Sequence, residues 1–311
     1  MKALVLGGSG FIGSHLVDRL LAGGNDVRVM DRQHELYRPP LPGVDYHIAD
    51  FGNRAQLHTT LEDRDVVFHL VSTTVPRTSN EDPAFDVMSN VVETLYLLDQ
   101  CVRTTVKKVV FVSSGGAVYG TPARLPVSED DPTNPQSSYG IAKLTIEKYL
   151  ALYHRLHGLD YAIVRPSNPY GPRQNHLGDQ GVVAVFMGRI ASGQPIDVWG
   201  GGESVKDYLF IDDLTEGIYR VATQATPSKV FNLGSGAGLS VNELVGLIGE
   251  IVGCQPVVVR SSGDILDVSK IYLDTTRAQR ELSWQPTTPI RVGLRRTWEF
   301  MTTALGPVGP R

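Results

Sequence analysis

Short apolar runs alternate with longer stretches of helical periodicity over the first half of the chain. The apolar runs have the length of buried strands and fall at residues 3–6, 27–30, 66–70, 109–112 and 161–164. The segments between them include helix-length patterns at residues 84–103 and 138–156. Parallel strands linked by crossover helices form a doubly wound sheet, which binds ligands beyond the carboxyl ends of its strands. The pattern therefore predicts an α/β fold with a Rossmann-type doubly wound parallel sheet.

A glycine-rich turn joins the first predicted strand to the first helix. The string GGSGFIG at residues 7–13 comes immediately before the helical pattern of residues 15–21. Its first glycine permits a tight turn, the second lets backbone approach a pyrophosphate, and the third lets the helix pack on the strand. The order of strand, turn and helix predicts a dinucleotide site built from Gly7, Gly10, Phe11, Ile12 and Gly13.

Two further segments are candidates for the adenosine end of this site. Asp31 ends the second strand, where its carboxylate can accept hydrogen bonds from the ribose hydroxyls of NAD and repel a 2′-phosphate. Arg32 follows directly and would favour NADP, so that alternative stays open behind NAD. Asp50 and Phe51, which lie between the predicted strands 27–30 and 66–70, could face the adenine, although a turn aspartate beside a half-buried aromatic explains them equally well.

The regular alternation of apolar runs and helical patterns ends after residue 165. A Pro-rich segment, RPSNPYGPRQ, is followed by a helical pattern at residues 182–191 and several shorter elements. We expect residues 1–165 to form the NAD-binding domain and residues 166–311 to form mainly a smaller C-terminal substrate-binding lobe. Residues 211–233 are expected to return to the first domain, so the division is not a single cut.

Composition and charge narrow the classes of function. The 311 residues are 41% hydrophobic and 20% charged, with a formal net charge of −4 and no clustered basic segment, which argues against a nucleic-acid binder. No apolar stretch is long enough to span a bilayer. The two cysteines and eight histidines form no metal-ligand motif, so we expect reduced thiols, no metal and a cytoplasmic location.

A Tyr-x-x-x-Lys spacing opens one of the predicted helices. Tyr139 and Lys143 are four residues apart and therefore share one helix face. A lysine charge lowers the pKa of a neighbouring phenol, and its amine can hold a nicotinamide ribose. The spacing is common on solvated helices, but its position after a nucleotide-binding pattern favours a phenolate that acts as general base near neutral pH.

Four ordered motifs together resemble the NAD-dependent epimerase/dehydratase family of extended short-chain dehydrogenases. They are GGSGFIG, YGIAK, RPSNPYGPRQ and VKDYLFIDDL. The resemblance covers nearly the whole chain and is strongest to UDP-glucose 4-epimerase-like members. It implies epimerisation of a nucleotide sugar, with a UDP-sugar as the expected substrate. Tyr139 would take a proton from a sugar hydroxyl while hydride passes to bound NAD, and the hydride would return to the other face of the keto-sugar.

The resemblance also implies roles for residues that periodicity does not single out. Asn168 and Lys206 would approach the diphosphate of the substrate, and Arg260 lies close to the position of a further family arginine. The family often has an arginine at position 206, and lysine cannot bind a phosphate through two parallel hydrogen bonds as arginine does, so the identity of the nucleotide stays open. A solvated surface lysine without a role in binding is an equal alternative. The cofactor would be lined by Leu70, Val71, Ser72, Asn90 and Pro166, with Tyr139 and Lys143.

Gly115 departs from the family pattern. The family usually has a Ser or Thr four residues before the tyrosine of its Val-Tyr-Gly segment, which here is Tyr119. Ser114 is the nearest hydroxyl, but alternation along a strand would turn it to the opposite face. Thr74 and a bound water are the other candidates for the hydrogen bond to the reacting oxygen.

The residues after Gly115 discriminate among reactions. Dehydratases of the family have an Asp-Glu pair there, whereas this chain has Gly116 and Ala117, so epimerisation is the better hypothesis. A nucleotide-sugar or keto-sugar oxidoreductase and a non-catalytic NAD-binding sensor or scaffold stay open as alternatives. The predicted helices 84–103 and 138–156 resemble those that pair family members into homodimers.

Overall fold

Seven parallel strands form the central sheet of the computed structural model, which describes residues 1–178, 180–261 and 268–304. Their order across the sheet is β11-β6-β5-β4-β1-β2-β3, and every neighbouring pair is parallel. The strands are β1 (Lys2–Leu6), β2 (Asp26–Asp31), β3 (Val44–Ile48), β4 (Val66–His69), β5 (Lys108–Val112), β6 (Asp160–Pro166) and β11 (Val230–Leu233). The predicted doubly wound sheet is thus confirmed.

Each face of the sheet has its own hydrophobic core. Successive residues of β1 alternate between the two cores: Ala3 and Val5 belong to one, and Leu4 and Leu6 to the other. The first core is covered by α1 (Phe11–Ala22) and α8 (Ile211–Thr223). The second is covered by α2 (Arg54–Leu61), α4 (Glu93–Arg103) and α6 (Ser138–His157). Helices on both faces explain why the strands read as continuous apolar runs.

The predicted helix over residues 84–103 has a more complex form than its periodicity indicates. It begins as α3 (Pro83–Asp86), widens into a π-helical turn η1 (Val87–Val92), and continues as α4. The Nδ2 of Asn90 donates to the backbone and side-chain oxygens of Asp86, 3.1 and 2.9 Å away. π-Turns inside helices are frequent at functional sites, and this one lies beside the site described below.

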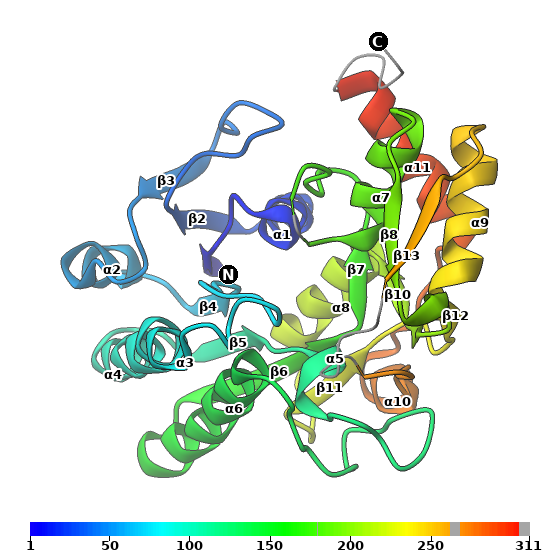
Figure 1. Cartoon of the computed structure of the whole chain (residues 1–311). Helices are drawn as coiled ribbons and strands as arrows, with labels where there is room; N and C mark the ends of the chain where they lie inside the picture. The colour runs from blue at the N-terminus through cyan, green and yellow to red at the C-terminus, as the bar shows by residue number, and fades with distance from the viewer. Residues whose placement is uncertain (179, 262–267, 305–311) are drawn as a thin grey trace.

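The C-terminal lobe is built from short strand pairs and helices and lies on the opposite side of Figure 1 from α2, α4 and α6. Its strand pairs are β7 (Asn168–Tyr170) with β10 (Tyr208–Phe210), β9 (Val205–Lys206) with β12 (Leu239–Ser240), and β8 (Ile196–Trp199) with β13 (Val258–Ser261). Its helices are α7 (Val182–Ala191), α9 (Val241–Val252), α10 (Thr276–Leu282) and α11 (Ile290–Ala304), with a short 3-10 turn η2 (Gly200–Gly202). Between them, residues 211–233 supply α8 and β11 to the central sheet.

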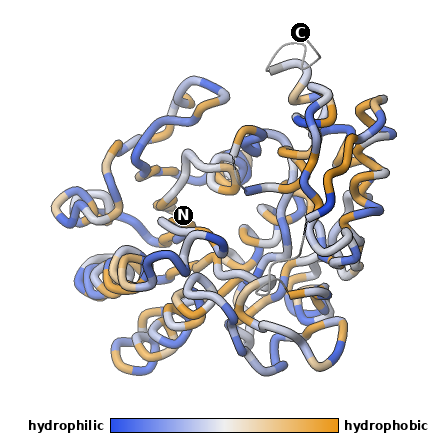
Figure 2. The backbone as a smooth tube through the Cα atoms, viewed as in Figure 1, coloured by the Kyte–Doolittle hydropathy of each residue, from blue (hydrophilic) through white to orange (hydrophobic). Residues whose placement is uncertain are grey.

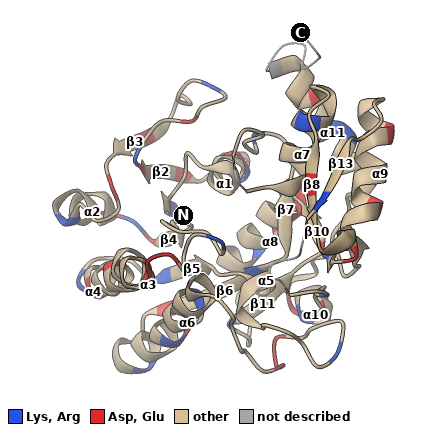
Figure 3. Cartoon of the chain, viewed as in Figure 1, with Lys and Arg blue, Asp and Glu red and all other residues tan. Residues whose placement is uncertain are grey.

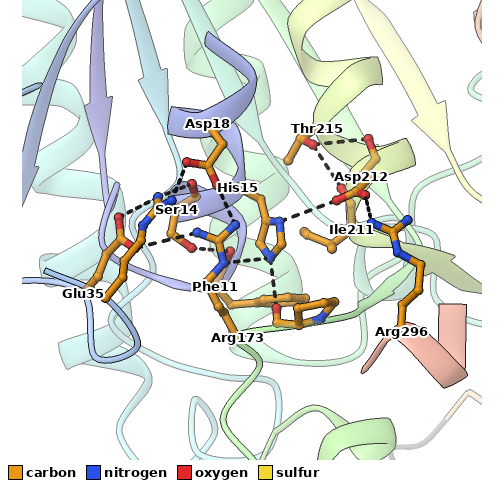
Figure 4. A network of polar contacts seen from close by, with 12 residues as sticks. Phe11, Ser14, His15, Asp18, Glu35, Arg173, Ile211, Asp212, Thr215 and Arg296 are labelled. Carbon is orange, nitrogen blue, oxygen red and sulfur yellow. Dashed lines mark hydrogen bonds and ion pairs between the residues drawn. The ribbon is translucent and has the colours of Figure 1, made fainter. Parts of the chain in front are cut away.

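A chain of charged side chains ties α1 to the C-terminal lobe (Figure 4). Asp18 on α1 accepts hydrogen bonds from Arg38 Nη1 at 2.6 Å and from Arg173 Nη2 at 2.7 Å. On the other side, Arg296 of α11 donates to Asp212 of α8 at 2.7 Å. Arg38 lies in the loop after β2 and Arg173 in the loop after β7, so two loops that border the strand ends are held on one helix.

Charged residues of both signs are spread over the molecule. Acidic and basic residues are interspersed over the drawn helices and loops (Figure 3). Helices α4 and α6 carry hydrophobic as well as hydrophilic residues along their length (Figure 2). Within the described ranges, no helix combines the length and the apolar character that a membrane crossing requires.

Candidate active site

A cavity opens at the carboxyl ends of β1, β2 and β4. It brings together most of the residues predicted to bind the cofactor, namely Gly7, Gly10, Asp31, Arg32, Asp50, Phe51, Leu70, Val71 and Ser72. The remaining wall comes from Ser9, Met30 and neighbouring residues of the same strand ends. A doubly wound sheet binds ligands at this edge, where its strand order reverses.

The glycine turn fits a pyrophosphate. Gly7 has a φ of +82°, a left-handed conformation that side-chain-bearing residues rarely adopt. A Cβ on Gly13 would lie 2.1 Å from the Gly7 carbonyl oxygen and 2.7 Å from the Gly8 Cα, so only glycine allows this close approach. Gly10 is the N-cap of α1 and its side-chain-free backbone is exposed. The first N–H groups of α1 are therefore open to an anion.

Asp31 is held at the wall of this cavity by backbone. Its Oδ2 accepts from the Ser9 N–H at 2.9 Å and its Oδ1 from the Arg32 N–H at 2.7 Å. A carboxylate has lone pairs for about two further donors, which suits a ribose diol. Phe51 is buried, at 6% exposed, and packs 5.1 Å from the His69 ring, while Asp50 caps a turn by accepting from Gly52 at 2.8 Å.

Tyr139 and Lys143 share one face of α6, at the carboxyl ends of β4 and β5. The Lys143 Nζ lies 5.6 Å from the centroid of the Tyr139 ring and donates to the Val112 carbonyl at 3.1 Å. Only 5% of Lys143 is exposed. Burial lowers its pKa to about 8, although the charges of Asp86 and Glu147 act in the opposite direction. The amine is therefore poised close to neutral pH.

The Ser114 side chain lies beside the Tyr139 phenol and influences its pKa. Burial raises the pKa of Tyr139 to about 12; the nearby Ser114 side chain opposes this increase and the charge of Asp86 adds to it. Lys143 is not among the groups that act on this pKa in the ligand-free protein, and a phenolate near neutral pH stays a prediction for the complex with ligands. A further positive charge beside the phenol is needed to lower this pKa.

Ser114 lies just beyond the end of a central strand, beside Tyr139. β5 stops at Val112, and Ser114 is the N-cap of a short helix, α5 (Gly115–Val118). The Ser114 backbone is still extended, with φ −153° and ψ 113°, and its role at the reacting oxygen stays a prediction. A Cβ on Gly115 would lie 2.6 Å from Leu273 Cδ1 and 3.1 Å from the Pro166 carbonyl oxygen. Leu273 thus fills the space in which the family usually has a Ser or Thr side chain.

The Thr74 hydroxyl is engaged by a buried carboxylate, Asp86, which sequence reasoning missed. The hydroxyl donates to Oδ1 of Asp86, which is fully buried at the end of α3. Asn90 donates to the same oxygen and accepts from the Thr73 N–H at 3.0 Å, so it holds the loop after β4. The spacing of four between Asp86 and Asn90 was the available signal, since it places two polar side chains on one helix face.

A second buried polar group lies behind Lys143 and also escaped sequence reasoning. Glu147, one turn further along α6, accepts hydrogen bonds from Ser113 at 2.6 Å and from Arg165 Nη2 at 2.5 Å. Arg165 also donates to the Tyr119 hydroxyl at 2.9 Å. The buried ion pair of Glu147 and Arg165 fixes the third turn of α6 against β6 and therefore helps to position Lys143, one turn before it.

The three residues predicted to meet the diphosphate lie on three different strand pairs of the lobe. Asn168 on β7 donates through Nδ2 to the Asp207 carbonyl at 3.0 Å. Lys206 on β9 donates to the Val268 carbonyl. Arg260 on β13 is exposed and donates to a carbonyl of η2. Pro166 ends β6 below Gly115.

Comparison with known proteins agrees with this geometry. The profile of the NAD dependent epimerase/dehydratase family matches residues 3–234. A UDP-glucose 4-epimerase of Mycolicibacterium smegmatis is 38% identical over 96% of this chain and 98% of its own length. The structure of Thermotoga maritima UDP-glucose 4-epimerase with UDP-glucose aligns with a TM-score of 0.93 at 35% identity, covering 98% of this chain and 100% of that one. The Thermus thermophilus UDP-glucose 4-epimerase complex with NAD aligns at 0.92 and 31% identity, covering 98% and 100%.

Relatives with other reactions also match along the chain. An Escherichia coli dTDP-4-dehydro-6-deoxyglucose reductase is 30% identical over 94% of this chain and 94% of its own. A Streptomyces antibioticus dTDP-glucose 4,6-dehydratase is 31% identical over 96% of this chain and 92% of its own. The shared fold, the dinucleotide cavity and these matches lead to one assignment: the chain belongs to the NAD-dependent epimerase/dehydratase family and is an NAD-dependent enzyme that modifies nucleotide sugars.

Proposed function

We propose that this enzyme epimerises a UDP-sugar at C4 by transient oxidation and re-reduction. The observation that carries the proposal is the placement of Lys143 Nζ 5.6 Å from the Tyr139 ring centroid on one helix face, with the Ser114 side chain beside the phenol. This group can hold one hydroxyl oxygen and move its proton. The adjacent positions, Gly116 and Ala117, offer no acid or base for a second proton transfer.

The NAD-binding part would be residues 1–165 together with residues 211–233. In it the glycine turn at the start of α1 holds the pyrophosphate, Asp31 the adenosine ribose, and Lys143 the nicotinamide ribose. Asp50 and Phe51 border the adenine, and Asn90 acts from behind by fixing the loop after β4. When bound, NAD supplies a hydride acceptor for the sugar carbon and a positive charge near the phenol.

Proton transfer would pass through Tyr139. Its oxygen accepts the proton of the C4 hydroxyl as that carbon is oxidised, and returns it when the hydride comes back to the other face. Ser114 holds the same sugar oxygen and keeps it in line with the phenol. A pKa near 12 in the ligand-free protein limits this step to the complex, in which added positive charge stabilises the phenolate.

Dehydration is the less suitable reaction for this geometry. It needs a second acid–base group on the sugar, and positions 116 and 117 do not supply it. Asp86 is the carboxylate nearest in the hydrogen-bond network of the site, but it is fully buried and accepts from Thr74, Asn90 and Ser138. Its oxygens are therefore engaged inside the protein and do not reach a substrate.

The diphosphate of the substrate would be met by the C-terminal lobe, mainly residues 166–311. Asn168 and Lys206 supply an amide and a positive charge, and the exposed Arg260 is able to swing to the same ligand. Phosphate oxygens would replace the Val268 carbonyl as the acceptor for Lys206. UDP as the nucleotide of the substrate is supported by the relative whose structure contains UDP-glucose.

We further propose a homodimer that pairs α4 and α6 of two copies. Apolar side chains lie exposed along these helices and the turn before α4, at Met88, Val102, Ile141, Leu152 and Leu156. Association of the two helices with those of a second copy would remove this surface from water. Analytical ultracentrifugation tests it, since Leu156→Glu with Ile141→Glu is expected to produce monomers.

Incubation with separate UDP-sugars tests the reaction. Proton NMR of mixtures with UDP-glucose, UDP-N-acetylglucosamine or UDP-glucuronate is expected to show the C4 epimer of one of them without net NADH. Tyr139→Phe is expected to abolish its formation. Stoichiometric NADH would instead identify an oxidoreductase, and NAD binding with no turnover on any nucleotide sugar would favour a sensor or scaffold.

A further inference from the structure

Asp86 is a fully buried carboxylate at the junction of three segments of the active site. Its Oδ1 accepts from Thr74 in the loop after β4 and, at 2.9 Å, from Asn90 in the π-helical turn. Its Oδ2 accepts from the Ser138 hydroxyl at 2.6 Å. Ser138 is the first residue of α6 and directly precedes Tyr139, so this carboxylate is one residue from the candidate proton-transfer group.

The loop after β4 also supplies two hydrogen-bond acceptors to the first turn of α6. The Tyr139 N–H donates to Ser79 Oγ at 3.0 Å, and the Ser138 N–H donates to Asn80 Oδ1 at 2.9 Å. These bonds satisfy helix N–H groups that have no partner within α6. A negative charge at a helix N-terminus is also favourable, because the helix dipole is positive there. Asp86 therefore supports α6 through one direct hydrogen bond and through its charge.

Buried charged and titratable groups around Tyr139 and Lys143 come from several elements. The charged ones are Asp86 on α3 and Glu147 on α6 with its partner Arg165 on β6. His69 on β4 is neutral, because burial lowers its pKa to about 3. Glu147 is already paired with Arg165, at 2.5 Å, so its charge is largely compensated. Asp86 accepts its three side-chain hydrogen bonds from neutral groups. Its negative charge consequently acts on Lys143 with less compensation than that of Glu147.

We infer that Asp86 is a positioning residue of this active site, which fixes the first turn of α6 and the loop after β4 and keeps Lys143 protonated. The inference rests on the proposed function of Tyr139 and Lys143. It divides into a geometric part, carried by the hydrogen bond to Ser138, and an electrostatic part, carried by the buried charge. Two substitutions separate these parts.

Asp86→Asn removes the charge and keeps a side chain of the same shape. We expect the pKa of Lys143, measured by NMR on lysine labelled with ¹³C at Cε, to fall from about 8 by roughly one unit. Lys143→Arg assigns the resonance. The alkaline limb of the kcat profile should move to lower pH by the same amount. Asp82→Asn is the matched control, because Asp82 is an exposed acid that caps the same helix α3.

Ser138→Ala removes the hydrogen bond and keeps the charge. We expect kcat to fall roughly tenfold through misplacement of Tyr139, with the Lys143 pKa unchanged. It also tests the geometric part if Asp86→Asn does not fold. An unchanged Lys143 pKa in a folded Asp86→Asn protein, or an unchanged kcat in Ser138→Ala, would overturn the inference.

The NMR titration needs no turnover, so it separates this inference from the reaction itself. A shifted Lys143 pKa in a protein that epimerises none of the sugars tested would support the role of Asp86 and contradict the proposed function. Epimerisation by a folded Asp86→Asn protein with an unshifted pH profile would support the proposed function and contradict the role of Asp86.

Discussion

Substitution of Gly115 tests how this site replaces the family hydroxyl. A serine there puts a Cβ 2.6 Å from Leu273 Cδ1, whereas carbon atoms in contact are about 3.5–4.0 Å apart. Leu273 would have to move by about 1 Å. It is 1% exposed and packs with Val118, Val127 and Ile271, so overpacking should cost roughly 2 kcal/mol. We expect Gly115→Ser to lower the free energy of unfolding by this amount and to bring no gain in kcat.

A double-mutant cycle isolates the contact. Leu273→Ala alone should cost about 3 kcal/mol through the cavity that it leaves. Gly115→Ser combined with Leu273→Ala should be less destabilised than the sum of the two changes, by roughly 1 kcal/mol, because the serine then has space. Urea denaturation at equilibrium measures all three free energies, provided that the slopes of the transitions agree.

Ser114 supplies the activity side of the same test. Removal of one hydrogen-bond donor from a reacting oxygen costs about 10²-fold in kcat, so Ser114→Ala should show this loss and Ser114→Thr should retain most activity. A Gly115→Ser protein that is as stable as the parent and more active would refute the packing argument. Full activity of Ser114→Ala would show that Thr74 or a water holds the sugar oxygen instead.

Three further predictions follow from the buried charges and the cofactor cavity. Burial lowers the pKa of Lys143 from 10.5 to about 8, so the folded protein pays the free-energy cost of a buried ammonium group below pH 8, and this cost is relieved as pH rises toward 10.5. The free energy of unfolding of the parent relative to Lys143→Met should therefore rise by about 3 kcal/mol across that pH window. Urea unfolding at several pH values measures this difference. The Arg173 side chain is 11% exposed, and Arg173→Met should lower the free energy of unfolding by roughly 2 kcal/mol because it removes a mostly buried ion pair with Asp18. In the control Arg124→Met, the lost ion pair with Asp131 is made by an arginine side chain that is 72% exposed, so the free energy of unfolding should change by less than about 1 kcal/mol. Asp31→Ser should weaken NAD binding by roughly 2 kcal/mol and narrow the preference over NADP in calorimetric titrations, and unchanged NAD affinity would contradict its role at the ribose.

Much of the fold could be predicted from local pattern. The central strands are buried on both faces, so each reads as a short apolar run, and the glycine turn requires backbone that only glycine adopts. The start of helix α9 also follows a local signal, because Ser240 accepts from the Glu243 N–H in a capping box. β3 has no such apolar run, because it lies at the sheet edge and is only half-buried.

The catalytic surroundings could be predicted less completely, because they depend on contacts between distant segments. The tyrosine and lysine were identifiable from their spacing, but the contact of Leu273 with Gly115 joins two different parts of the chain. Asp86 has no motif of its own and is recognisable only once Ser138 and Thr74 lie beside it. The position of Ser114 beside Tyr139, at the N-cap of α5, is equally a property of the folded chain.

Transfer of an isotope within one sugar tests the central claim most directly. UDP-glucose that carries deuterium at C4, or the corresponding UDP-sugar that proves to be the substrate, is incubated with the enzyme and the product is analysed by NMR and mass spectrometry. Removal and return of the same hydride predict a C4 epimer that retains the deuterium, with no reduced cofactor in solution. Loss of deuterium to water, or its accumulation in released NADH, would contradict the account.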